Sequence, residues 1–166
     1  MVITFFISVS LFVFYILQIV NLYGVLPSLS TAYYKLPNKL KFLWTGLCCF
    51  CSIILGISLV GVSIEINPTS TFLVILTILG IVLVGMMPAF NDKFQGIFHT
   101  IGAVLAAICS TVWVVWNGFY AIPIICYIMG LILGLSKRSA FTWWIEMSAF
   151  ANMFIVTGLL IDRYFN

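Results

Sequence analysis

The sequence contains very little charge. Of its 166 residues only 7% are charged, four are acidic and one is a histidine. Soluble domains carry about 25% charged residues, and nucleic-acid-binding domains present a clustered basic surface. The composition therefore argues against both classes. A single histidine also argues against the membrane hydrolases that hold a catalytic zinc ion, because their sites need several histidine ligands.

The five cysteines indicate neither a disulfide framework nor a metal site. Their number is odd, and all lie inside apolar runs, where a free thiol behaves as a small apolar side chain. Cys48 and Cys51 have the C-x-x-C spacing, but zinc would need further ligands that the sequence does not supply. We expect no metal and no cofactor.

Long apolar runs dominate the chain, which is 64% apolar. A helix needs about 20 apolar residues to cross about 30 Å of hydrocarbon. The runs predict an all-α, polytopic membrane protein, a bundle of six transmembrane helices in one domain over residues 1–166. The first run follows Met1 with no preceding basic residue, which favours a span over a cleaved signal peptide. The expected helices cover residues 3–22, 42–62, 71–87, 96–116, 119–135 and 140–161.

The basic residues predict the orientation. Of the seven, only Arg163 lies on the side of the two termini, and the other six lie in the three opposite connections. Short loops rich in Lys and Arg stay in the cytoplasm, so both termini should be extracytoplasmic. One helix fewer would invert every connection after it. The six basic residues of these connections are Lys35, Lys39, Lys41, Lys93, Lys137 and Arg138.

The usage of Ile, Phe, Lys and Asn favours a bacterial or phage source, and thus a multi-pass protein of the bacterial cytoplasmic membrane.

Small residues mark the expected helix contacts. Gly102, Ala106 and Ser110 repeat every four residues, and Gly130 and Gly134 form a small-xxx-small motif. Such patterns let helix backbones approach closely in lipid. We expect the 96–116 helix to be central and both patterns to pack within the chain, with a homo-oligomer face as the alternative.

Two ionisable side chains lie within the predicted spans. His99 is about one turn into the fourth helix and Glu146 nearly two turns into the sixth, at similar depth. A charge at depth costs about 2.5–3.5 kcal/mol and normally faces protein or water. The two side chains could pair directly if their helices are neighbours, with Asp92 capping the fourth helix or lying over the pair.

These polar residues predict a cytoplasmic-facing mouth that binds a lipid or other hydrophobic small molecule. One alternative is an intramembrane enzyme that acts on a lipid or isoprenoid by acid/base catalysis with His99, Glu146 and Asp92. Another is a structural or partner-binding envelope protein in which the same residues only lock helices together. Apart from membrane lipids, no partner is indicated. The candidate ligand-binding residues are His99, Glu146, Asp92, Asn91, Tyr33, Tyr34 and Trp143.

Three short stretches carry a resemblance. PSLSTAYYKLP follows the first helix, MPAFND and HTIGA border the start of the fourth, and WWIEMSAF lies in the sixth. In these the chain resembles small six-helix membrane proteins of unknown function from gut bacteria and their phages. It is also distantly similar to the Frag1/DRAM/Sfk1 group, in which a Pro-x-x-Ser motif follows the first helix. The resemblance implies a six-helix bundle and brings no established catalytic residues. Members of that group whose N-terminus is cytoplasmic would place the PSLS loop outside the cytoplasm. This disagrees with the orientation that the basic residues predict here.

Overall fold

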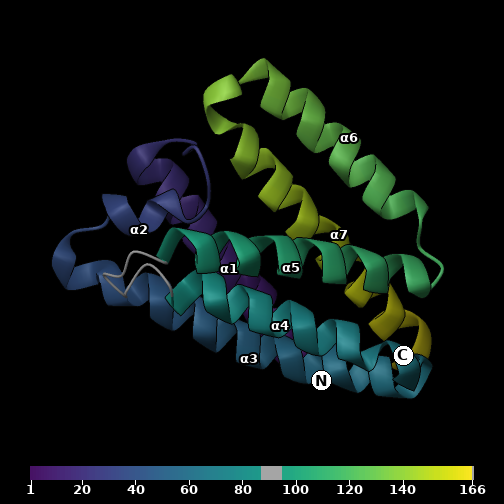
Figure 1. Cartoon of the computed structure of the whole chain (residues 1–166). Coiled ribbons are helices and arrows are strands. Elements are labelled where there is room, and N and C mark those ends of the chain that lie inside the picture. The colour runs from purple at the N-terminus through teal and green to yellow at the C-terminus, as the bar shows by residue number, and fades with distance from the viewer. Residues whose placement is uncertain (87–94, 166) are drawn as a thin grey trace.

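A computed structural model describes residues 1–86 and 95–165, and within these ranges the chain is entirely helical with connecting turns (Figure 1). The apolar runs predicted the long helices to within a few residues, and the largest differences are at the C-terminal ends of α3 and α7. Short helical turns occupy the connections: α2 (Thr31–Lys35), η1 (Asn38–Leu40), η2 (Pro68–Ser70) and η4 (Arg138–Ala140). The long helices are α1 (Val2–Tyr23), α3 (Lys41–Ile66), α4 (Thr71–Met86), α5 (Gln95–Trp116), α6 (Ala121–Ser136) and α7 (Phe141–Phe165).

Among the described residues, five helices are long and apolar enough to cross a membrane: α1, α3, α4, α5 and α7. The sixth, α6, is apolar but has 16 residues. At about 1.5 Å per residue it rises about 24 Å, less than the hydrocarbon thickness of about 30 Å. The all-α, multi-pass architecture is thus supported by five helices, and a sixth crossing stays a prediction.

The helices form two groups that meet at α7. In one group α3, α4 and α5 lie side by side, with α1 packed against α3 (Figure 1). In the other, α6 packs against α7 and stands apart from the rest of the bundle (Figure 1). Much of the apolar surface of α6 is exposed, including Ile124, Ile125 and Ile132. This surface has the composition of a lipid-facing one.

Glycines allow α4 and α5 to touch through their backbones. A Cβ added at Gly80 would lie 2.6 Å from the Gly102 carbonyl oxygen and 2.7 Å from the Ala106 nitrogen. A Cβ added at Gly102 would lie 2.8 Å from the Gly80 carbonyl oxygen. No side chain fits at either position. The predicted close packing around Gly102 and Ala106 is confirmed, and the partner is α4.

The other small-residue motif packs within the chain as well. A Cβ at Gly130 would lie 2.8 Å from the Trp144 carbonyl oxygen, and one at Gly134 would lie 2.9 Å from the Phe141 ring. Both glycines of α6 therefore face α7. The prediction of intrachain packing is confirmed for this motif.

The connection between α1 and α2 folds back over one end of the bundle. Gly24 ends α1 with a φ of 73°, a left-handed conformation that glycine adopts without strain. Further along, the N–H of Trp143 donates to the carbonyl of Pro27 at 3.1 Å. Trp143 lies in the first turn of α7, where backbone N–H groups have no partner within the helix. The connection therefore caps α7 and covers that end of the bundle.

The close approach of α4 and α5 gives a first prediction. Gly80→Ala forces a methyl group against backbone atoms, which cannot move aside as a flexible side chain can. We expect it to lower the free energy of unfolding by about 1–3 kcal/mol. The measurement is the thermal unfolding midpoint of the detergent-purified protein.

Gly46→Ala is the matched control, because Gly46 lies in α3 and a Cβ there meets nothing within 4 Å. We expect no loss of stability in this variant. Equal midpoints for the two variants would contradict backbone contact at Gly80.

Candidate functional site

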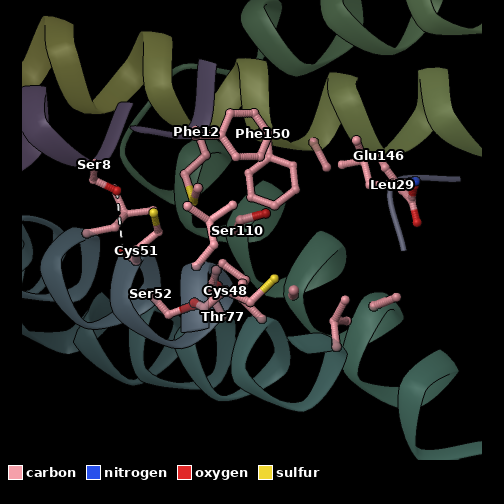
Figure 2. A pocket seen from close by; sticks show the side chains of 18 of the residues that line it. Ser8, Phe12, Leu29, Cys48, Cys51, Ser52, Thr77, Ser110, Glu146 and Phe150 are labelled. Carbon is pink, nitrogen blue, oxygen red and sulfur yellow. Dashed lines mark hydrogen bonds between the residues drawn. The ribbon is translucent and has the colours of Figure 1, made fainter. Parts of the chain in front are cut away.

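A cavity of about 110 Å³ lies between α1, α3, α4, α5 and α7. Figure 2 shows its interior, with Phe12 of α1 and Phe150 of α7 against each other on one side. Their ring centroids are 4.5 Å apart. The short alanines of α5 leave the space open, since larger side chains there would fill it. Apolar lining residues include Phe12, Leu55, Ile81, Ala103, Ala107, Phe150 and Met153.

The serine and threonine hydroxyl groups along the cavity are already hydrogen-bonded. Ser52 donates to the Cys48 carbonyl, Thr77 to the Leu73 carbonyl at 2.8 Å, and Ser110 to the Ala107 carbonyl at 3.2 Å. Each of these bonds stays within one helix, so the donors are not available to a ligand. The body of the cavity is therefore apolar in effect.

Glu146 is the one charged side chain among the described lining residues, and it lies at one end of the cavity (Figure 2). Its Oε2 accepts a hydrogen bond of 2.6 Å from the backbone N–H of Leu29, which belongs to the connection between α1 and α2. Leu29 is buried, so without this bond its N–H would lack a partner. The described residues offer Oε1, the second carboxyl oxygen, no hydrogen bond.

Two aromatic side chains with unused polar atoms line the same cavity. The rings of Tyr15 and Trp44 have centroids 5.8 Å apart. Among the described residues, neither the buried Tyr15 hydroxyl nor the buried Trp44 Nε1 has a hydrogen-bond partner. Trp44 packs in one cluster with Leu29, the residue that holds Glu146. These groups lie at the Glu146 end of the cavity. Buried hydrogen-bond donors without partners are uncommon in folded proteins.

His99 and Glu146 do not form the pair that their similar depth suggested. The Nδ1 of His99 lies 3.2 Å from the carbonyl oxygen of Val84 on α4, and His99 is not among the lining residues. Glu146 is held by Leu29 instead. The two side chains therefore point to different partners, although their helices are neighbours.

The remaining predicted residues lie away from the cavity or outside the described ranges. Tyr33 and Tyr34 form an edge-to-face pair on α2 at 5.3 Å, and Lys41 Nζ lies 5.2 Å from the Tyr33 ring centroid. Trp143 is buried beside the lining and bonds to the connection through its backbone. Neither tyrosine nor Trp143 lines the cavity. Asn91 and Asp92 lie outside the described residues.

Sequence reasoning did not identify Tyr15 and Trp44. Tyr15 lies in the interior of the first apolar run, although tyrosines of membrane helices gather near the interfaces. Its position away from the expected interface was the one feature of the sequence that could have identified Tyr15. Trp44 lies close to the start of its run, where it has the position of an ordinary interfacial residue.

Residues 1–86 and 95–165 contain no group of three or more His, Cys, Asp and Glu side chains able to hold a metal ion. All five cysteines are free thiols. Comparisons with protein families, curated proteins and solved structures find no match to this chain. The functional inference rests on the cavity itself, and the resemblance to six-helix phage and gut-bacterial proteins stays a prediction.

The bond between Glu146 and Leu29 gives a second prediction. Glu146→Ala leaves the buried Leu29 N–H without an acceptor, which costs about 1–3 kcal/mol of stability. Glu146→Gln keeps a carbonyl oxygen at the same place and should retain most of the stability. Unfolding midpoints and amide hydrogen exchange at Leu29 measure both effects. Equal exchange at Leu29 in wild type and Glu146→Ala would refute the structural role of this bond.

Proposed function

We propose that this protein binds the apolar chain of a lipid or other hydrophobic small molecule in the five-helix cavity, without covalent chemistry. The observation that carries the proposal is the division of the cavity into an apolar body and one polar end. The walls of the body are aromatic, aliphatic and alanine side chains, and the polar end holds Glu146, Tyr15 and Trp44. A site of this form matches an amphiphile.

The size of the cavity favours one chain. One water-sized group requires about 10–15 Å³ of cavity volume, so the cavity holds about seven to eleven such groups. A single alkyl or isoprenoid chain of moderate length has this bulk. A lipid with two long acyl chains does not fit without a large rearrangement of the bundle.

Acid/base catalysis has less support from the described residues. A general acid or base must come within about 2.6–3.2 Å of the reacting atom. His99 lies outside the cavity and is engaged with the Val84 carbonyl. Within the described lining, the other groups able to exchange a proton are the Tyr15 hydroxyl and the thiols of Cys48 and Cys51, all of which are weak acids. Reversible binding is therefore the function that the site favours.

We further propose that the Glu146 end of the cavity faces the cytoplasm. Lys41, Lys137 and Arg138 border the connections at this end, which the bond from Trp143 to Pro27 brings together. Arg163 lies near the opposite end of α7. Basic residues accumulate on the cytoplasmic side of membrane proteins.

Filling the cavity tests the binding function. Ala107→Phe places a ring in the apolar body, so we expect the purified protein to lose about tenfold or more of its co-purifying lipid or hydrophobic compound. Native mass spectrometry with identification of the released compound is the measurement. The adjacent Ile108 is 55% exposed, so Ile108→Phe adds the same ring outside the cavity and serves as the control.

A compound retained equally by wild type and both variants would show that the bound molecule sits on the outer surface. A wild-type protein that carries no compound, and takes up none from mixed lipids, would overturn the binding function itself. Unfolding midpoints of the two variants show whether a loss of binding is a loss of fold.

The orientation is tested with reporter fusions at Asn166. A reporter active only outside the cytoplasm should give signal, and one active only in the cytoplasm should not, because Arg163 and the C-terminal end of α7 lie opposite the Glu146 end of the cavity. A cytoplasmic signal would contradict the outside C-terminus. A second fusion at Ser136 reports the connection between α6 and α7, and an extracytoplasmic signal there would show that this connection does not lie on the cytoplasmic side.

A further inference from the structure

The polar end of the cavity has a defined set of hydrogen-bonding atoms that the described residues leave unused. The Nε1 of Trp44 can only donate, the Tyr15 hydroxyl can donate and accept, and Oε1 of an ionised Glu146 can only accept. Trp44 is 4% exposed, so water does not readily serve its N–H. A ligand head group that complements this end must accept at least one hydrogen bond and donate one.

The three groups belong to one place in the fold. Tyr15 and Trp44 lie ring to ring, and Trp44 packs with Leu29 in one buried cluster. Leu29 in turn fixes the carboxyl group of Glu146 at 2.6 Å. All of these residues line the same cavity. The three side chains therefore belong to one end of the cavity.

Charged head groups complement this end poorly. The described lining contains no Lys, Arg or His, so a phosphate or carboxylate head would face Glu146 without a counter-charge. An ammonium head would satisfy Glu146, but it has no lone pair to accept the hydrogen of Trp44 Nε1. A ketone or ester carbonyl accepts hydrogen bonds but gives none to Glu146.

A hydroxyl group meets all three requirements, because it donates one hydrogen bond and accepts two. We propose that the ligand is a neutral, single-chain amphiphile with a hydroxyl head, a long-chain or isoprenoid alcohol. Its O–H donates to Oε1 of Glu146, and its oxygen accepts from Trp44 Nε1 and from the Tyr15 hydroxyl. The apolar chain runs from there past Phe12 and Phe150. This inference rests on the proposed binding function and names its ligand class.

The test compares head groups on one chain. Dodecanol, dodecylamine, dodecanoate and dodecyl phosphate are offered at equal concentration to the delipidated full-length protein in a bulky detergent. Native mass spectrometry gives the bound fraction of each. We expect dodecanol to be retained at least about tenfold better than each of the other three.

Conservative variants identify the side chains that hydrogen-bond the hydroxyl head of the ligand. Trp44→Phe and Tyr15→Phe remove the N–H and the O–H and keep an aromatic ring, so each should reduce the preference for dodecanol by about threefold to tenfold. Trp116→Phe is the control, because Trp116 is 53% exposed and lies outside the cavity. It should leave the preference unchanged. If Trp44→Phe or Tyr15→Phe lowers the unfolding midpoint, the preference for dodecanol is judged from the other of these two variants.

The outcomes separate the head-group inference from the binding function. Stronger retention of dodecylamine would overturn the hydroxyl assignment in favour of a cation site, and the cavity would remain a binding site. Equal retention of all four probes, sensitive to Ala107→Phe, would show that only the chain is recognised. Retention of none would overturn both proposals. A preference for dodecanol that survives Trp44→Phe and Tyr15→Phe would also overturn the assignment.

Discussion

The hydrogen bond from Leu29 to Glu146 is the constraint on which the rest of this structure depends. A carboxyl group inside an apolar bundle and a buried backbone N–H in an irregular connection are both unfavourable alone. One bond of 2.6 Å resolves both, and it joins the connection after α1 to α7. With Trp143 bonded to Pro27 a turn away, this connection has two attachments to the same helix. The end of the cavity is closed by a segment that would otherwise be an ordinary loop.

The contrast between the two faces of α5 explains why a cavity exists in a bundle that is elsewhere tightly packed. Gly102 and Ala106 bring the backbone of α5 against α4 at Gly80. Ala103, Ala106 and Ala107 also line the cavity, and their small side chains leave space between α5, α1 and α7. Small residues thus have two opposite effects on one helix, and the effect at each position depends on which helix lies opposite.

Much of the fold could be predicted from sequence, because apolar runs and glycine spacing are local properties. The limits of α4 and α5, and the packing role of Gly130, follow from them. The sequence also predicted that His99 and Glu146 lie within long helices, which are α5 and α7. Rotation about the helix axis could not be predicted, and it is rotation that turns His99 towards Val84 and Glu146 towards Leu29. The pairing of Tyr15 with Trp44 depends on how α1 and α3 are set against each other, which no local pattern contains.

The shortness of α6 has a consequence for the membrane around the protein. If α6 crosses the membrane as the sequence predicts, a bilayer beside a helix of 16 residues and α7, with 25 residues, would thin locally or draw its head groups inward. Lys137 and Arg138, at the end of the short helix, suit such a depression because their long side chains reach phosphate groups. Because α6 packs against α7, a thinner bilayer on this flank would bring the membrane surface closer to the helix that carries Glu146.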